Sequence, residues 1–134
     1  MSHINSIESL EDAIDALKDK ANEEQLKQCE IWANEILRHP ELNTFYNKEV
    51  WAKNEAKLLD PSGSIAIPDR LVKIENDYTL IEYKTGLPSP RHLEQVNQYS
   101  DLINRLDPSG QRNVKQRFIL YLSAHEKGLE VHSI

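Results

Sequence analysis

The stretch IPDRLVKIENDYTLIEYKTG, residues 67–86, decides the fold of this chain of 134 residues. Two runs rich in β-branched and aromatic residues, which are typical of strands, lie on either side of Asn76 and Asp77, which favour turns. The pattern predicts strands over residues 64–74 and 78–84. Because the link between them is short, the two strands should pair as an antiparallel hairpin.

A third strand is predicted over residues 50–58, directly before the hairpin. The link to it contains Asp-Pro-Ser-Gly at positions 60–63, residue types that favour a tight turn. The three strands should therefore form an antiparallel meander. Two more strands are expected later in the chain, over residues 114–123 and 129–134.

Helical patterns precede these strands. Apolar residues recur at three- and four-residue spacing between Ser6 and about Leu42, which predicts two amphipathic helices. We expect the second helix to begin near Asn22, whose spacing to Gln25 resembles a capping box. We expect it to end at Pro40, where a short turn of another helix follows.

Another helix, with the strongest pattern, follows the hairpin. Ser89 is suited to cap its N-terminus, and Pro90 suits the first helical position. An apolar stripe marks its buried face, formed by Leu93, Val96, Tyr99, Leu102 and Ile103. The order of elements predicts an α/β fold, with a mixed sheet of four to five strands, helices on both faces and an N-terminal helical segment.

Length and composition predict a single domain. With 134 residues, 39% of them apolar, the chain is long enough for one core and short for two. We expect a helical segment over residues 1–48 and an α/β core over residues 49–134. No stretch approaches the roughly 20 apolar residues that span a bilayer, so we expect a soluble, cytoplasmic protein with no membrane partner.

The sequence also argues against several cofactors. Cys29 is the single cysteine, so the chain cannot form an internal disulfide or hold an iron–sulfur cluster through its own cysteines. No G-x-G-x-x-G or G-x-x-x-x-G-K-[ST] motif is present. A dinucleotide site and a P-loop motor therefore have no support.

The charge is unevenly distributed along the chain. The net charge of −6 argues against a protein that coats nucleic acid by bulk electrostatics. Residues 1–69 carry a net charge of −7, whereas residues 70–134 carry +1. A bound polyanion would therefore meet the second half of the chain.

Three charged residues of the hairpin, Asp69, Glu82 and Lys84, are candidates to share one face. If the loop consists of Glu75 and Asn76, antiparallel register places Asp69 directly opposite Glu82. A loop shifted by one residue would place Asp69 opposite Lys84, with Glu82 on the diagonal. A three-residue loop would turn Asp69 to the other face unless a bulge intervened.

Two neighbouring carboxylates repel each other and lose hydration, so something must compensate. A divalent cation such as Mg²⁺ or Mn²⁺ is one solution, because these ions favour carboxylate, carbonyl and water oxygens. Lys84 is another. A metal-activated water beside a lysine suits the hydrolysis of phosphodiesters. A structural interpretation stays open, in which Asp69 pairs with Arg70 or Lys84 at a sheet edge.

Three motifs, in this order, resemble the PD-(D/E)xK nuclease superfamily. They are IPDR at 67–70, LIEYKTG at 80–86 and QVNQY at 95–99. Their spacing over a strand, a second strand and a helix is similar to the RecB/AddA-type nuclease domain at the C-terminus of UvrD-like helicases. The resemblance covers roughly residues 50–123 and implies a restriction-endonuclease-like core.

The resemblance also implies the roles of the hairpin residues. Asp69 and Glu82 would be ligands of Mg²⁺ or Mn²⁺, with the backbone carbonyl of Tyr83 as a third ligand. Lys84 would be the catalytic lysine. The implied activity is metal-dependent hydrolysis of DNA.

Gln95 and Tyr99 match the helix motif of the family. Their spacing of four residues places them on one face of the helix. From the residues alone, Tyr99 would belong to the core or to an interface, whereas Gln95 on an apolar stripe needs a polar partner. The resemblance implies that both serve catalysis by holding the catalytic lysine or the DNA strand.

Three further residues are candidates for contact with substrate or support of the metal. Glu55 matches an acidic position common in the family and would support the metal, accept a hydrogen bond from Arg70 or form a surface salt bridge. Arg70 would contact phosphate or pair with Glu55. His92, one turn before Gln95, would face the site or be solvated at the start of the helix.

The resemblance implies an exonuclease that works with a helicase motor region or subunit in DNA repair or recombination. RecB-type nucleases carry a further metal-ligand histidine upstream of the meander, and neither His3 nor His39 suits that position. We therefore expect the chain to be part of a larger helicase–nuclease. The AddB-like branch frames its nuclease with four cysteines around an iron–sulfur cluster, so a single cysteine places this chain outside that branch.

Other functions stay open at this stage. A nuclease of the same fold could act on RNA or on branched DNA. The domain could also be a catalytically inactive module that binds DNA or docks onto a motor, which the acidic helical half would favour. Finally, its acidic helices could bind a basic partner.

Overall fold

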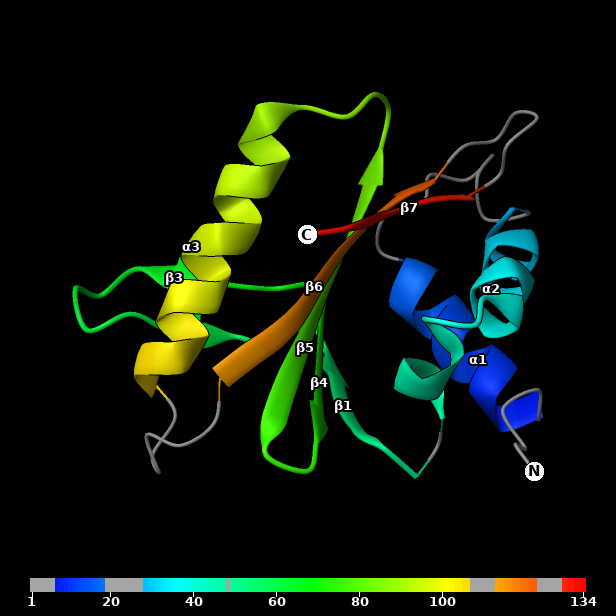
Figure 1. Ribbon diagram of the computed structural model, residues 1–134, viewed down its shortest axis with the longest axis horizontal. Helices are drawn as coiled ribbons and strands as arrows, with labels where there is room; N and C mark the ends of the chain where they lie inside the picture. Colours follow the sequence, from blue (N-terminus) through cyan, green and yellow to red (C-terminus); the bar gives the residue numbers. More distant parts are fainter. Residues whose placement is uncertain (1–6, 19–27, 48, 107–112, 123–128) are drawn as a thin grey trace.

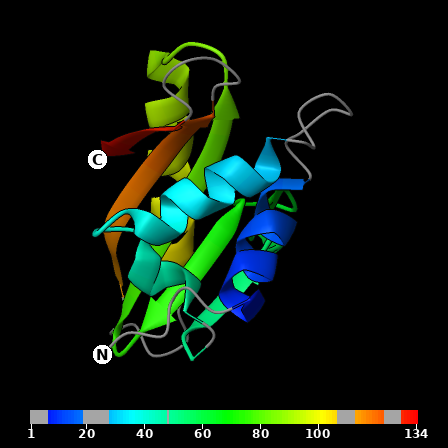
Figure 2. The same ribbon diagram turned by 90° about the vertical axis from the view of Figure 1, so that its right-hand side faces the viewer.

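The computed structural model describes residues 7–18, 28–47, 49–106, 113–122 and 129–134. The fold is α/β, as predicted: helices α1 (Ile7–Lys18) and α2 (Cys29–Arg38) cover one face of a mixed five-stranded sheet, and helix α3 (Pro90–Leu106) covers the other (Figure 1). Figure 2 shows this layering from the side, with α1 and α2 in front of the sheet and α3 behind it.

The N-terminal segment forms α1 (Ile7–Lys18), α2 (Cys29–Arg38) and a 3₁₀ helix, η2 (Asn43–Tyr46). The expected end of the second helix before Pro40 and the short turn that follows are confirmed. The predicted capping pair of Asn22 and Gln25 lies outside the described residues. Across the described residues, no helix combines the length and the hydropathy that a membrane crossing requires.

The sheet has the strand order β1-β4-β5-β6-β7. The first three form the predicted antiparallel meander, and α3 (Pro90–Leu106) crosses over from β5 to a parallel partner, β6. Strand β7 pairs antiparallel with β6 at the edge. The bounds are Trp51–Asn54 for β1, Arg70–Ile74 for β4, Asp77–Thr85 for β5, Asn113–Leu122 for β6 and Leu129–Ser133 for β7.

Two of the predicted strands are interrupted. Strand β1 ends at Asn54, because Glu55 adopts the left-handed conformation with φ of 50°. The strand expected over residues 64–74 breaks before β4, where Pro68 has no N–H to donate to a ladder. The intervening residues pair in a separate two-stranded sheet of β2 (Leu58–Leu59) and β3 (Ile65–Ala66).

Alternation along the strands divides their side chains between two cores. Residues such as Val72, Ile81 and Tyr83 pack with the N-terminal helices. Leu71 and Leu80 are among those that pack with α3. On β5, Glu82 and Lys84 follow Leu80 by two and four residues, so their side chains lie on the same face as that of Leu80, the face that α3 covers.

Candidate active site

The hairpin between β4 and β5 has a two-residue loop. Ile74 pairs with Asp77, so the loop consists of Glu75 and Asn76. Glu75 has φ of 54°, and such left-handed conformations are characteristic of two-residue hairpin loops. Of the three loops that the sequence left open, the structure therefore has the first.

This register places Asp69 and Glu82 opposite each other. Arg70 pairs with Ile81, and one further step along the antiparallel ladder brings Asp69 to Glu82. The backbone amide of Asp69 donates to Oε1 of Glu82 at 2.8 Å, and the amide of Tyr83 donates to Oδ2 of Asp69 at 2.8 Å. The two acidic residues are only 7% and 2% exposed. Each carboxylate is therefore buried and fixed by the backbone of the opposite strand.

Ionisation of Glu82 beside Asp69 is electrostatically unfavourable. Burial and, next in size, the negative charge of Asp69 raise the pKa of Glu82 to about 8. The hydrogen bond from the Asp69 amide and the charge of Lys84 act in the opposite direction. Because burial beside Asp69 favours the protonated form of Glu82, an accompanying cation would help the site to hold Glu82 in its ionised form.

Lys84 is tied to the crossover helix. Its Nζ donates to Oε1 of Gln95 at 2.6 Å, and Nε2 of Gln95 donates to the hydroxyl of Tyr99 at 3.1 Å. The start of α3 is capped as predicted, because the Arg91 amide donates to Oγ of Ser89 at 3.3 Å. The structure thus brings Lys84 together with both residues of the helix motif.

Tyr99 also lies within electrostatic reach of the acidic pair. Burial raises the pKa of Tyr99, the charges of Glu82 and Asp69 raise it further, and the hydrogen bond from Gln95 lowers it. The phenol is therefore neutral at physiological pH and keeps its proton. It stands as an uncharged anchor for the Gln95 amide.

The Arg70 guanidinium lies on the other face of the sheet from Asp69 and Glu82. Its Nη1 donates to Oδ1 of Asn54 at 2.7 Å, and its Nη2 donates to the Phe45 carbonyl at 2.8 Å. The guanidinium lies 4.2 Å from the ring centroid of Tyr46, and the residue is 4% exposed. Successive residues of a strand point to opposite faces, so Arg70 faces the N-terminal helices whereas Asp69 faces α3.

Glu55 is connected to the site through its backbone. Its amide donates to the carbonyl of Asp69 at 2.8 Å, and the residue is exposed. The next amide, of Ala56, donates to the Pro68 carbonyl at 3.2 Å. These bonds join the end of β1 to the segment that carries Asp69.

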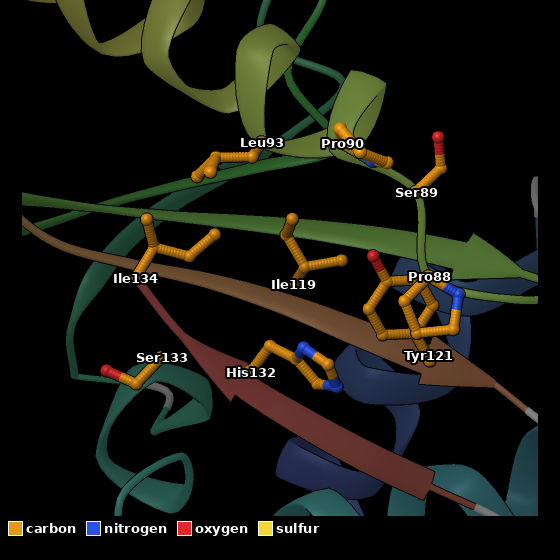
Figure 3. Close-up of a pocket in the computed structure, with 9 residues that line it drawn as sticks. All are labelled: Pro88, Ser89, Pro90, Leu93, Ile119, Tyr121, His132, Ser133 and Ile134. Carbon is orange, nitrogen blue, oxygen red and sulfur yellow. The ribbon is translucent and has the colours of Figure 1, made fainter.

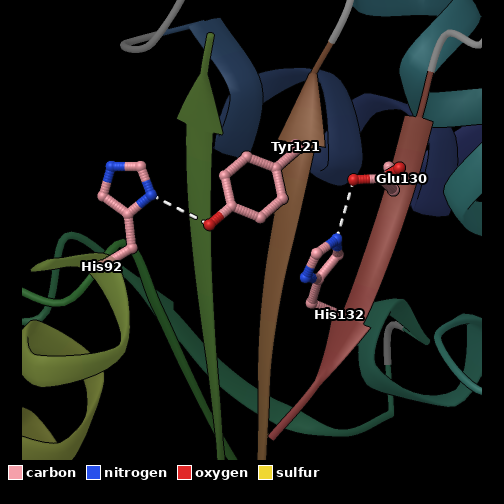
Figure 4. A network of polar contacts seen from close by, with 4 residues as sticks. All are labelled: His92, Tyr121, Glu130 and His132. Carbon is pink, nitrogen blue, oxygen red and sulfur yellow. Dashed lines mark hydrogen bonds and ion pairs between the residues drawn. The ribbon is translucent and has the colours of Figure 1, made fainter. Parts of the chain in front are cut away.

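Beyond Lys84, the same face opens into a cavity of about 420 Å³ between the start of α3 and strands β6 and β7 (Figure 3). A polar network borders it (Figure 4). Nδ1 of His92 is 2.9 Å from the hydroxyl of Tyr121, and Nε2 of His132 is 2.7 Å from Oε2 of Glu130. Burial lowers the pKa of His92, and the charge of Lys84 lowers it further. The His92 ring thus lies near Lys84, and its hydrogen-bond partner is Tyr121.

The sequence gives no comparable signal for Tyr121 and His132. Tyr121 is the neighbour of Lys84 across β5 and β6, and its ring contacts that of His132 edge-on, with centroids 4.8 Å apart. In sequence, Tyr121 belongs to an apolar run that indicates only a buried strand. Its position beside Lys84 depends on the parallel register, which is set by how α3 packs and by no local pattern.

The acidic pair fits a hard divalent cation. Within the described ranges, no three His, Cys, Asp or Glu side chains gather to hold a metal, so protein ligands beyond Asp69 and Glu82 would have to be backbone atoms such as the Tyr83 carbonyl. The Tyr83 side chain points to the opposite face, where its hydroxyl bonds to that of Tyr46. One or two carboxylates, completed by waters and substrate phosphates, are the usual protein ligands of Mg²⁺.

Comparison with known proteins does not identify a family. No protein-family model matches the chain, and no curated protein is significantly similar to it. The chain is similar to a crystal structure of SSO0001, with 15% sequence identity and a TM-score of 0.43, over 99% of this chain and 70% of that one. A similarity of this degree indicates no activity.

Proposed function

We propose that the protein is a metal-dependent nuclease that hydrolyses phosphodiester bonds in DNA. One observation carries the proposal: Asp69 and Glu82 are buried opposite each other, and Lys84 lies on the same face of β5, held by α3. The described bonds of the Arg70 guanidinium go to Asn54 and to the Phe45 carbonyl, on the other face of the sheet.

The two carboxylates and the Tyr83 carbonyl would hold Mg²⁺ or Mn²⁺. A divalent cation bound there would lower the pKa of a water molecule and stabilise negative charge on a phosphate. The amides of Asp69 and Tyr83 fix one oxygen of each carboxylate at 2.8 Å. These bonds restrict the rotation of both carboxylates, which organises the ligands before binding.

Lys84 would act on the phosphate or on the attacking water. Its flexible side chain is restrained by the 2.6 Å bond to Gln95, and Tyr99 accepts from the other end of the same amide. Because the amide nitrogen is engaged with Tyr99, the amide oxygen is the atom that faces the lysine. Gln95 and Tyr99 are therefore positioning residues, and a preorganised ammonium stabilises developing negative charge.

The resemblance of the three motifs to RecB/AddA-type domains extends the proposal. On that basis the preferred action is exonucleolytic, and the partner is a helicase motor in repair or recombination. The net charge of +1 over residues 70–134, against −7 over residues 1–69, agrees with DNA meeting the half of the chain that carries Lys84.

A second candidate function is a nuclease-fold module that binds DNA without cleaving it. One observation favours it: in the part of the chain that the structure describes, no third acidic, histidine or cysteine side chain joins Asp69 and Glu82. Such a module would bind DNA equally well with and without divalent cations and would leave it intact.

The two functions are separated by cleavage of a labelled oligonucleotide with Mg²⁺ or Mn²⁺. We expect Asp69→Asn and Lys84→Met each to lower the rate by about 10²-fold or more. Asp77→Asn, at the far end of the same hairpin, is the control and should cleave like the wild type. Asn at position 69 can still accept from the Tyr83 amide, so the fold should persist. Undiminished cleavage by Asp69→Asn would contradict the proposal, and DNA binding without cleavage by the wild type would support the second candidate.

A further inference from the structure

Strand β7 is an edge of the five-stranded sheet. Among the described strands it pairs only with β6, and an edge strand presents backbone groups that can pair with another chain. The amide of Ile134 donates to the Arg117 carbonyl at 2.9 Å, so the backbone of Ile134 is directed toward β6. Because this direction alternates along an antiparallel strand, the backbone groups of Leu129, Val131 and Ser133 are directed toward the open edge.

The sequence of β7 does little to prevent such pairing. Proteins commonly protect an edge strand with lysine, with proline or by keeping the strand short. Strand β7 has the sequence LEVHS, without lysine, arginine or proline. The opposite edge differs, because β1 carries the exposed Lys53 and ends where Glu55 adopts the left-handed conformation. Of the two edges, β7 is therefore the one suited to pairing.

The charges of β7 are complementary to an antiparallel copy of the same strand. Oε2 of Glu130 lies 2.7 Å from Nε2 of His132, and both side chains are on one face of the sheet (Figure 4). An antiparallel copy centred on Val131 would place Glu130 of each copy opposite His132 of the other. A parallel copy in register would place the two carboxylates side by side, which is unfavourable. The charge pattern thus favours a second copy of this chain in the antiparallel orientation.

The backbone favours the same register. In an antiparallel ladder, residue pairs that exchange hydrogen bonds alternate with pairs that do not. With Val131 at the centre, its amide and carbonyl meet those of the other copy, and Leu129 meets Ser133 of the other copy. These are the residues whose backbone groups are directed toward the open edge. Glu130 and His132 then form the pairs without backbone hydrogen bonds, in which the side chains approach most closely.

We propose that β7 is a homodimer interface, at which two copies join antiparallel about Val131 into one continuous sheet. The two-fold axis of such a dimer is perpendicular to the sheet, so α3 of both copies covers the same face. On that face, beside β7, Leu93 and Ile134 are 43% and 36% exposed and line one cavity with His132 (Figure 3). The second copy brings the same apolar residues to the other side of the axis. Dimerisation is independent of metal binding and of cleavage.

The test is analytical ultracentrifugation of the protein from about 1 μM to about 1 mM, which should show a monomer–dimer equilibrium. Val131→Pro removes the outward amide at the axis, and an edge strand tolerates proline where the amide faces away from the sheet. We expect this variant to dimerise at least about tenfold more weakly, because a hydrogen bond is lost on each side of the axis. Circular dichroism and urea denaturation check that it is folded.

The matched control is Ala52→Pro, at the opposite edge of the sheet. The Glu55 amide donates to the Asp69 carbonyl, so alternation directs the backbone groups of Ala52 away from β4. This variant should dimerise like the wild type. Hydrogen exchange gives a second measurement: the amide of Val131 should exchange more slowly as the protein concentration rises, whereas that of Ala52 should not change.

A charge exchange tests the register without a change in the backbone. Glu130→Lys places an ammonium opposite His132 of the other copy and should weaken dimerisation by about three- to tenfold. Adding His132→Glu to the same chain restores opposite charges and should restore dimerisation. This pair of variants decides the question if Val131→Pro fails to fold.

Several outcomes would overturn the inference. A wild type that stays monomeric throughout would leave the edge to an extended segment of another protein. An unchanged dimer in Val131→Pro, or equal weakening in Ala52→Pro, would place the interface elsewhere on the molecule. Failure of the added His132→Glu change to restore dimerisation would exclude the antiparallel register about Val131.

Discussion

Nζ of Lys84 lies 2.6 Å from Oε1 of Gln95, and this contact joins the middle strand of the sheet to its crossover helix. The two residues are only 11 positions apart in sequence, because α3 follows β5 directly and folds back over it. The placement of Lys84 is therefore a direct consequence of the strand–helix–strand crossover, and changes in α3 should alter the lysine without changing the carboxylates.

Replacing Gln95 should separate positioning from metal binding. Gln95→Leu removes the acceptor that restrains the ammonium of Lys84, so we expect cleavage to slow by about 10- to 100-fold, as misplacement of a catalytic group does. Mn²⁺ affinity, measured by calorimetry, should stay at the wild-type value. Gln98→Leu, on the exposed side of the same helix, is the control. Loss of metal binding in Gln95→Leu would show that Gln95 acts on the carboxylates.

Metal binding should depend on pH through Glu82. Burial and Asp69 raise the pKa of Glu82 to about 8, so below that pH a cation must displace a proton. We expect Mn²⁺ affinity to rise by up to about tenfold per pH unit until about pH 8 and then to level off. Calorimetry in buffers of different ionisation enthalpy measures the protons released. Binding that is independent of pH between about pH 6 and about pH 8 would contradict this assignment.

The raised pKa of Glu82 also predicts how the free energy of unfolding of the metal-free protein depends on pH. The pKa of Glu82 is raised from 4.5 to about 8 on folding, so the folded state binds more protons than the unfolded state between these values. Stability should therefore fall as pH rises through this window. Glu82→Gln removes the ionisation and should raise the free energy of unfolding above about pH 8 by ~2–4 kcal/mol relative to the wild type. The free energy of unfolding of both proteins is measured by urea denaturation across this pH range. The same pH dependence in both proteins would contradict the prediction.

Arg70 should prove structural. Its guanidinium donates to Asn54 and Phe45 and lies over the ring of Tyr46 in a buried position. Arg70→Ala would leave these groups without their partner, and we expect a loss of about 3 kcal/mol in the free energy of unfolding. DNA affinity, measured where the variant is folded, should change less than twofold. A selective loss of DNA binding with unchanged stability would restore the phosphate-binding role.

The sequence predicts the acidic pair only conditionally. Asp69 and Glu82 are visible as residues of a hairpin, but a strand has a period of two, and a one-residue change in the loop at Glu75 would reverse the face of Asp69. The same periodicity applies to Arg70. Because it is the next residue after Asp69, alternation places its side chain on the other face of the sheet.

The observed bounds of two strands also differ from those that the sequence predicts. Residue-by-residue propensity extends the first strand through Glu55, but the left-handed conformation of Glu55 ends this strand. Propensity likewise extends the second strand through Pro68, whereas β4 begins only at Arg70. Tyr121 and His132 could not be assigned at all, since their place beside Lys84 requires the pairing of β5, β6 and β7. Local patterns predict which elements form, and tertiary packing decides which of their residues meet.

The central claim is that Asp69 and Glu82 form a metal site, and the most direct measurement is a calorimetric titration of the metal-free protein with Mn²⁺. We predict binding by the wild type and by the control Asp77→Asn, and no binding by Asp69→Asn under the same conditions. Absence of binding to the wild type, or binding that persists unchanged in Asp69→Asn, would contradict the account.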